Sequence, residues 1–371
     1  MELTIERDAF IKSLSKVQGI VEKRNAMPIL SNTLLKAEEE GLQVIATDLE
    51  VTVMDKCPVS LQSGGNLTLN AKKLFDVVRE MDPGPVSLTS DDDYKVVVKA
   101  GKMRYELMGM PSEDYPKVPD TADLDFVNVP AETLLEMILK TIYASGGEEA
   151  RFSIHGIYAE KGEDNDKVLR MVATDGHRMA MIDRELDSME KVKIENGVIL
   201  PRKGMSEAAK LLADIEGEVG FAVQEKMAAV SVEDTVLVMR LVDGKFPDYR
   251  KVIVEGCDKT ATIDKGKLVK NLRSASHLVD EKARAVKFAF SENTLALESK
   301  NQNFGSFNSE MEIEYDGTPV TIGFNDRYFL DIANTSKGDK LKVELKDEQS
   351  PAMVKLAEDD NYTCVVMPMR L

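Results

Sequence analysis

The chain has 371 residues, of which 43% are hydrophobic, and a formal net charge of −17. This length supports two or three domains with cores of their own, and the acidic balance argues against a protein that coats nucleic acid through a uniformly basic surface. No membrane-length apolar run and no basic-then-apolar leader occurs, and three distant cysteines lack CxxC spacing. Reduced thiols and a cytoplasmic location are therefore expected.

A strand followed by an amphipathic helix recurs at domain-sized intervals. Its copies are ELTIERDAFIK from Glu2, FVNVPAETLLE from Phe126 and TATIDKGKLVK from Thr260. A second set follows the same plan within each third of the chain, as GNLTLNAKKLF, GVILPRKGMSE and PVTIGFNDRYF. Two or three strand-like runs follow each helix, so the pattern predicts six βαβββ units.

The repeat predicts an α+β fold of three similar domains, over residues 1–125, 126–254 and 255–371. The first two end in the Pro-containing stretches LMGMPSEDYPKV and LVDGKFPDYRKV, which are typical of linkers. The third ends in CVVMPMRL. Because Pro368 cannot donate to a strand ladder, we expect this last strand at a sheet edge or leaving the sheet.

Charge is divided unevenly between the expected helices and the remainder. Helices expected over 9–24, 71–80, 131–141, 201–210, 265–277 and 325–337 carry a net charge of +9, which leaves −26 elsewhere. For any single helix, lysines on a solvated face are sufficient to explain its positive charge. The separation of positive charge in the six helices from negative charge in the rest of the chain favours a helical surface that faces something anionic.

The Gly-rich stretch ASGGEEARF is not a phosphate-binding P-loop, because the chain contains no GxxxxGK followed by Ser or Thr. A nucleotide-driven motor is therefore disfavoured. The stretch is either a mobile surface turn or a contact loop that uses Arg151.

Asp175 and His177, in VATDGHRMAMI, suggest a general base or metal ligands. The equivalent stretch of the first repeat, IATDLEVTVM, keeps the aspartate as Asp48 but has no histidine. An aspartate that recurs without its partner is better explained as a turn residue that binds local backbone groups. A β-rich hydrolase using Asp175 and His177 is the alternative to a non-catalytic protein; one asymmetric site would favour it, and three similar domains oppose it.

The motifs ATDGHR, LPRKG, DGKFPDYRKV and VVMPMRL, in this order on a threefold repeat, resemble the DNA polymerase III beta subunit family, the bacterial sliding clamps. The resemblance covers the whole chain. It implies three domains of the DNA-clamp fold, assembled as a head-to-tail homodimeric ring with helices inside and sheets outside. It also implies a non-catalytic subunit, without cofactor or metal, that encircles duplex DNA and tethers the replicative polymerase.

Simple geometry agrees with a dimeric ring. A hole of roughly 35 Å, which admits hydrated duplex DNA, has a circumference near 110 Å and takes about twelve helices at about 9 Å each. One chain offers six expected helices, so two chains close the ring.

The resemblance also implies site residues. Expected DNA contacts are Arg24, Arg151, Phe152 and Lys203, with Lys72, Lys73, Arg79 and Arg202 as further candidates on the expected helices. The expected partner-peptide pocket comprises Ile154, Thr174, Gly176, His177, Arg178, Met179, Pro247, Lys251, Val252, Val365, Met367, Pro368, Met369, Arg370 and Leu371. Tyr105 and Leu107 are expected to meet the partner's His277 and Leu278.

Expected partners are the clamp loader, replicative and accessory polymerases, and proteins of the mismatch-repair and ligase type. Two positions depart from the family pattern. Glu148 stands where the family's best-known member has a DNA-touching glutamine, and His277 stands where an apolar residue is usual.

Overall fold

The computed structural model describes residues 1–21, 27–147, 152–280 and 284–370. Within them, a strand, a helix and three further strands follow one another six times. The predicted βαβββ plan is therefore confirmed. Two short strands, β5 (Ser60–Ser63) and β22 (Glu314–Tyr315), are additional to it.

The elements of the six repeats are as follows. The first third contains β1 (Glu2–Glu6), α1 (Arg7–Gln18), β2 (Asn32–Glu38), β3 (Gly41–Thr47), β4 (Val51–Cys57), β6 (Gly65–Asn70), α2 (Ala71–Arg79), β7 (Pro85–Ser90), β8 (Lys95–Ala100) and β9 (Met103–Met108). The middle third contains β10 (Val127–Pro130), α3 (Ala131–Ile142), β11 (Gly156–Lys161), β12 (Val168–Thr174), β13 (Arg178–Glu185), β14 (Val198–Pro201), α4 (Arg202–Leu212), β15 (Glu218–Gln224), β16 (Met227–Val232) and β17 (Thr235–Arg240). The last third contains β18 (Lys259–Asp264), α5 (Lys265–Ala275), β19 (Ala285–Ser291), β20 (Thr294–Asn301), β21 (Gly305–Glu312), β23 (Val320–Asn325), α6 (Asp326–Thr335), β24 (Lys340–Leu345), β25 (Ala352–Leu356) and β26 (Asp359–Val366).

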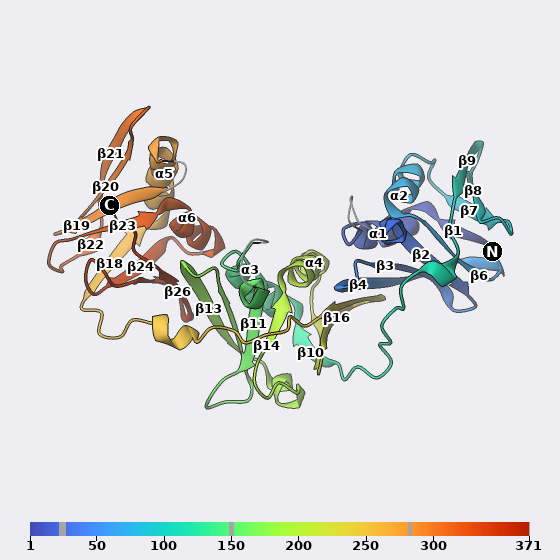
Figure 1. The fold of residues 1–371 in the computed structure, drawn as a ribbon, viewed down its shortest axis with the longest axis horizontal. Helices are drawn as coiled ribbons and strands as arrows, with labels where there is room; N and C mark the ends of the chain where they lie inside the picture. Colours follow the sequence, from blue (N-terminus) through green and yellow to red (C-terminus); the bar gives the residue numbers. More distant parts are fainter. Residues whose placement is uncertain (22–26, 148–151, 281–283, 371) are drawn as a thin grey trace. The chain divides into compact units, whose positions relative to one another are not determined.

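These elements form two compact units. The first unit comprises Met1–Leu135, Glu190–Ile194 and Lys203–Leu241. It contains a five-stranded sheet in the order β5-β1-β7-β8-β9 and an eight-stranded sheet in the order β10-β15-β16-β17-β4-β3-β2-β6. Helices α1 and α2 pack against each other, and α1 also packs on β3 and β4 (Figure 1).

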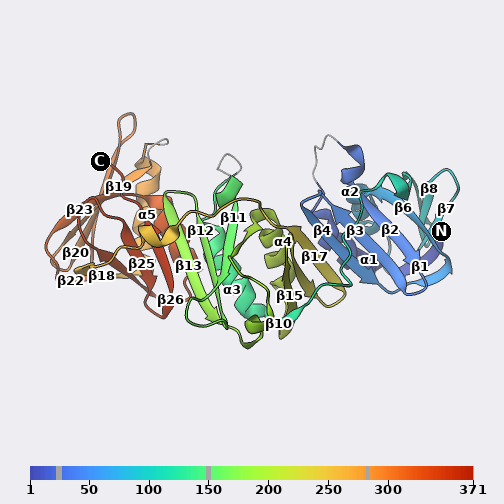
Figure 2. The same ribbon diagram turned by 60° about the horizontal axis from the view of Figure 1, so that its bottom comes forward.

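The second unit comprises Glu136–Met189, Glu195–Arg202 and Val242–Leu371. Its nine-stranded sheet has the order β14-β11-β12-β13-β26-β25-β24-β18-β22, and its four-stranded sheet has the order β21-β20-β19-β23. The strands β11, β12, β13 and β26 run side by side in Figure 2. This larger sheet brings the last strand of the chain next to β13 of the middle third.

The polar residues between strand and helix act as helix caps. The side chains of Asn70, Asp264 and Asn325 each accept a hydrogen bond from a backbone N–H in the first turn of α2, α5 and α6. Asn and Asp are favoured there because their oxygen binds an N–H group that has no partner within the helix. The same kind of cap thus starts α2, α5 and α6.

Helix α1 is shorter than the helix expected over residues 9–24. It ends at Gln18, and its C-cap is Gly19, where a Cβ atom would lie 2.9 Å from Oε2 of Glu207. Lys23 and Arg24, which were expected in this helix, lie outside the described residues.

Pro368 lies beyond the last strand. Strand β26 ends at Val366 and pairs on both sides, with β13 and with β25. An edge position for this strand is therefore wrong, and the other expectation is right: the chain leaves the sheet before the proline. Among the described helices, none is long and apolar enough to cross a membrane.

Candidate functional site

A cavity of about 800 Å³ opens in the second unit beside the turn between β12 and β13. Nine of the fifteen residues expected in the peptide pocket line it: Ile154, Thr174, Gly176, Arg178, Met179, Pro247, Val252, Val365 and Met367. They come from four separate stretches of sequence. The fold therefore brings together Ile154 and the ATDGHRM, FPDYRKV and VVM segments.

Five of the remaining expected residues do not line the cavity directly. His177, Lys251 and Arg370 are exposed, Pro368 and Met369 are half-buried, and none of these five is a lining residue. Leu371 lies outside the described residues. The lining residues that were not expected in the pocket are Ser153, Asp175, Lys245, Phe246, Asp248 and Tyr249. Four of them belong to the DGKFPDYRKV motif. Assigning every residue of this motif to the pocket would therefore have predicted them.

Asp175 shapes the turn that borders the cavity. Its Oδ1 accepts hydrogen bonds from the backbone N–H of His177 at 2.9 Å and of Arg178 at 3.0 Å. Asp48 does the same for Glu50 and Val51 in the first unit, at 2.9 and 2.7 Å. The prediction that both aspartates are turn residues is confirmed.

The two equivalent turns differ at their second residue. Gly176 has φ +89°, and Leu49 occupies the same left-handed region with φ +79°. A leucine is strained in this region, whereas glycine is not. Leu49 is 53% exposed. The absence of such a side chain at Gly176 keeps this border of the cavity open.

Arg178 ties the turn to α6 and to the residue that follows α3. Nε donates to Oδ2 of Asp175 at 3.0 Å, Nη1 to Oδ2 of Asp331 on α6 at 2.6 Å, and Nη2 to the carbonyl oxygen of Tyr143 at 2.6 Å. Its guanidinium also lies 5.1 Å from the ring centre of Tyr143 and 4.6 Å from that of Tyr328. Burial lowers the pKa of Arg178, but its hydrogen bond to Asp331 and the nearby acidic charges outweigh this and raise it. Arg178 is therefore positively charged, and its hydrogen bonds hold the turn against its neighbours.

The aromatic side of the cavity is equally well anchored. Phe246 stacks on Tyr158 with ring centres 4.8 Å apart. Tyr249 donates its hydroxyl hydrogen to Glu160 and accepts from Nη1 of Arg170 at 3.2 Å. Burial and the bond to Glu160 raise the pKa of Tyr249 to about 12. A rigid aromatic wall of this kind is suited to apolar ligand groups.

The C-terminal segment forms the facing wall. The N–H of Met367 donates to the carbonyl oxygen of His177 at 2.9 Å, and the N–H of Met369 donates to that of Gly323 at 2.8 Å. Val365 is buried in the cluster that contains Met179 and Tyr249. The backbone is thus fixed, while the flexible Met367 side chain is left to adapt to a ligand.

The expected DNA contacts fall into three groups. Lys72, Lys73 and Arg79 are exposed on α2. On α4, Arg202 donates to the carbonyl oxygens of Ser145 and Gly146, and Lys203 is ion-paired with Asp48 and donates to the carbonyl oxygen of Ile20 at 3.2 Å. Arg24 and Arg151, and the side chain of Phe152, lie outside the described residues.

The expected dimer contacts lie at the surfaces of their units. Tyr105 and Leu107 are on β9, the last strand of the five-stranded sheet, and Tyr105 is exposed. His277 and Leu278 are in the short helix η6 (Ser276–Leu278), where His277 is exposed and Leu278 half-buried. Their meeting across two chains stays a prediction.

The chemistry of the turn disfavours the hydrolase. Both carboxylate oxygens of Asp175 accept hydrogen bonds, Oδ1 from the backbone and Oδ2 from Arg178. This leaves the carboxylate poorly placed to take a proton from a substrate.

Comparisons with known proteins agree with this fold and site. Models of the N-terminal, central and C-terminal domains of the DNA polymerase III beta subunit match residues 1–119, 128–248 and 250–370. The beta sliding clamp of Caulobacter vibrioides is 35% identical over 374 residues, and that of Pseudomonas aeruginosa 34% over 375, with all of both chains covered in each case. Solved clamp structures match as well. One is from Caulobacter crescentus, with TM-score 0.94 and 35% identity, and one is from Bartonella birtlesii, bound to griselimycin, with TM-score 0.94 and 33% identity; each covers both chains fully.

Repeated clamp domains with a cavity of this kind define a sliding clamp, a protein class that encircles duplex DNA and holds a polymerase on it. The chain belongs to the DNA polymerase III beta subunit family. It is thus a non-catalytic processivity subunit that acts in DNA replication. The family resemblance and the expectation of a non-enzymatic role are confirmed.

Proposed function

We propose that the cavity of the second unit is the docking site through which partner proteins are tethered to DNA. The clamp loader, the replicative polymerase and accessory polymerases would each insert a short apolar segment there, as would proteins of the mismatch-repair and ligase type. The observation that carries this proposal is the cavity of about 800 Å³ bordered by Gly176, Pro247 and Met367. Its size is within the range of ligand-binding pockets.

The lining of the cavity supports apolar peptides as ligands. Val252, Val365 and Met367 offer aliphatic surface, and Phe246 and Tyr249 offer aromatic surface. Burying one Leu or Phe side chain contributes about 1.5–3 kcal/mol. Short peptides should therefore bind weakly to moderately once the cost of ordering them is subtracted.

The Val252→Asp substitution tests the proposal directly. It places a charge in the apolar lining, and the matched control is Leu139→Asp, which replaces a half-exposed apolar residue of α3 that does not line the cavity. Peptide affinity measured by fluorescence anisotropy should fall more than tenfold for Val252→Asp and little for Leu139→Asp. Equal affinities in the two variants would place peptide binding elsewhere.

We further propose the assembly and its boundaries. Three domains, 1–125, 126–254 and 255–371, would form a head-to-tail homodimeric ring in the cytoplasm, closed where Tyr105 and Leu107 meet the partner's His277 and Leu278. The DNA would pass along a helical surface that includes Arg24, Lys72, Lys73, Arg79, Arg151, Phe152, Arg202 and Lys203. Contacts with phosphates are independent of sequence, so they allow sliding.

Retention on circular DNA tests the ring. A clamp loaded on nicked circular plasmid should stay bound and should be lost when the plasmid is linearised, because ring closure rather than contact strength holds it. Equal retention on both DNAs would contradict this arrangement.

A further inference from the structure

Asp331, on α6, is shared by two arginines in different surroundings. Its Oδ2 lies 2.6 Å from Nη1 of Arg178 and 3.9 Å from Nε of Arg327. The side chain of Arg178 is 9% exposed and lines the cavity, whereas that of Arg327 is 69% exposed. One carboxylate therefore connects the cavity with the solvent-exposed surface of α6.

Arg178 is committed to its own chain. Each of its three guanidinium nitrogens already donates to an oxygen, on Asp175, Asp331 and Tyr143. Asp175 in turn holds the N–H groups of the turn that borders the cavity. The position of this turn therefore depends on where Asp331 holds the guanidinium.

We propose that Asp331 is a positioning residue that couples the peptide cavity to the DNA-facing surface of α6, and that Arg327 is the phosphate-contacting residue at the outer end of this coupling. The proposal rests on the proposed function, in which the helices face DNA and the cavity takes peptides. It extends that function from two separate binding surfaces to two linked ones.

The coupling follows from competition for one carboxylate. Without DNA, the charge of Arg327 attracts Asp331 and weakens its hold on Arg178. A phosphate that pairs with Arg327 removes this competitor, so Asp331 holds Arg178 more firmly and the turn is better ordered before the peptide arrives. Pre-ordering raises affinity, and by linkage a bound peptide strengthens the DNA contact by the same factor.

The geometry of the two ion pairs sets how much the loss of each should change peptide affinity. The pair between Arg327 and Asp331 is long and exposed, so its removal should change peptide affinity by only about threefold. The pair between Asp331 and Arg178 is largely shielded, and breaking it takes one carboxylate partner from a buried guanidinium that keeps its pair with Asp175. Asp331→Asn should therefore weaken peptide binding by about tenfold, and Asp331→Glu should restore most of the loss.

The experiment compares peptide affinity on and off DNA. The full-length dimer is loaded on nicked circular plasmid, freed of loader, and titrated with a fluorescent peptide carrying leucine and phenylalanine; the same titration is done on the free dimer. The variants are Arg327→Ala, Asp331→Asn and Asp331→Glu. Lys267→Ala is the matched control, since it removes an exposed positive charge from α5, which packs beside α6.

The wild type and Lys267→Ala should bind the peptide about threefold more tightly on DNA, and Arg327→Ala should bind equally in both states. The coupling is overturned if DNA leaves wild-type affinity unchanged, if Arg327→Ala keeps the full difference, or if folded Asp331→Asn binds as the wild type does. Thermal unfolding and dimer mass establish folding; should Asp331→Asn unfold, the exposed Arg327→Ala decides. Peptide binding that survives Val252→Asp would instead contradict the proposed function.

Discussion

Lys16 on α1 and Asp55 on β4 form an ion pair of 2.9 Å in which the Asp55 side chain is only 5% exposed. Oγ1 of Thr235, on β17, accepts from Lys16 at 2.7 Å and donates to Asp55 at 2.6 Å. The three groups join a helix to two strands in the first unit. A lysine that the sequence assigns to a DNA-facing helix thus points inward.

Lys16→Ala should destabilise the first unit by about 2–4 kcal/mol, because it leaves a buried carboxylate without its cationic partner. Lys12 on the same helix is the control: its pair with Glu233, at 3.4 Å, is exposed on both sides. Lys12→Ala should cost less than about 1 kcal/mol. Urea unfolding measures both, and equal losses would contradict the internal role of Lys16.

A second ionic network makes the second unit sensitive to acid. Arg184 donates to both carboxylate oxygens of Glu136 at 2.9 Å, and Lys140 donates to Asp359 at 2.7 Å. Burial raises the pKa of both carboxyls, but their hydrogen bonds from Arg184 and Lys140 outweigh this, so both pKa values are lowered.

Because these carboxyls have a lower pKa in the folded state, they stabilise it fully above their unfolded pKa values of about 4, and this contribution is lost as the pH falls through the folded values. The free energy of unfolding should therefore drop steeply below about pH 4.5. Asp359→Asn should lower stability at pH 7 and flatten this dependence, whereas Asp360→Asn, at an exposed neighbour, should do neither. Urea titrations at several pH values check this, and an unchanged slope in Asp359→Asn would refute it.

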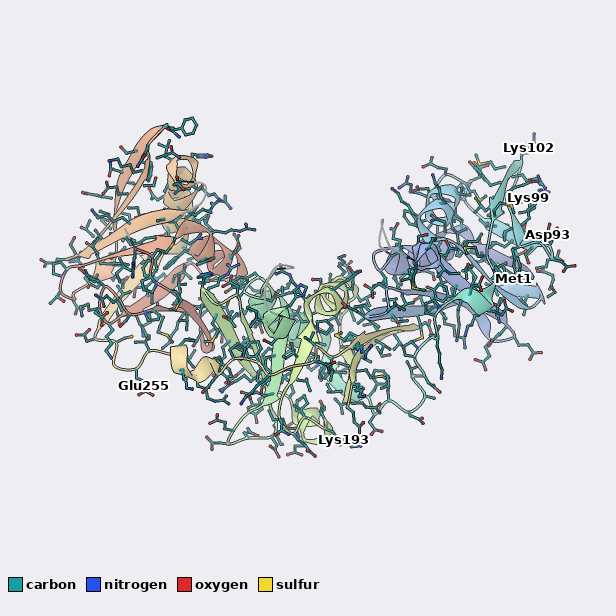
Figure 3. The ribbon with its side chains drawn as sticks, viewed as in Figure 1. Met1, Asp93, Lys99, Lys102, Lys193 and Glu255 are labelled. Atoms are coloured by element: carbon teal, nitrogen blue, oxygen red, sulfur yellow. The ribbon has the colours of Figure 1, made fainter. Side chains whose placement is uncertain are left out.

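The exposed lysines of α2 should contribute to DNA binding through phosphates alone. Lys72→Ala with Lys73→Ala should lower the slope of log affinity against log salt by roughly one unit per lost contact. Lys99 and Lys102 belong to the β8–β9 hairpin and project into solvent (Figure 3). The matched double variant at these two lysines should leave the slope unchanged, and an equal fall in both variants would mean that α2 is not the DNA-facing surface.

Deleting Met367 to Leu371 should remove one wall of the cavity while leaving β26 in its sheet. Val365 and Val366 stay paired with β13 and β25, so the truncated chain should remain a folded dimer that no longer binds the polymerase or loader peptides. Dimer mass and peptide affinity are measured on the same sample. Retained peptide binding would show that the peptide site lies elsewhere, and loss of the dimer would show that the tail is part of the core.

Sequence reasoning recovered the features that repeat. The six βαβββ units could be predicted because their strand–helix pattern recurs along the chain. The role of Asp175 could be predicted because Asp48 offered an internal comparison. The cavity could be assigned largely from the family resemblance, but Phe246 and Tyr249 were missed since their orientation depends on Tyr158 and Glu160, far away in the chain.

The net charge of the helices was the weakest guide to which residues face DNA. A count of lysines and arginines on helices does not distinguish those that face solvent from those that pair internally, as Lys16, Lys140 and Arg202 do. The interior place of β26 was also hidden, because its neighbour β13 lies nearly two hundred residues earlier and no local pattern reports such a pairing.

The pairing of β17 with β4 limits how the chain can be divided. These strands come from the middle and first thirds and exchange a continuous ladder from Thr235 and Asp55 to Met239 and Val51. A fragment that ends at residue 125 would carry β4 with one side of its backbone unpaired, and such an edge invites association with any available strand. Truncated fragments should thus form strand-swapped or aggregated species, so the three repeats, although alike, are not interchangeable modules that could be expressed singly.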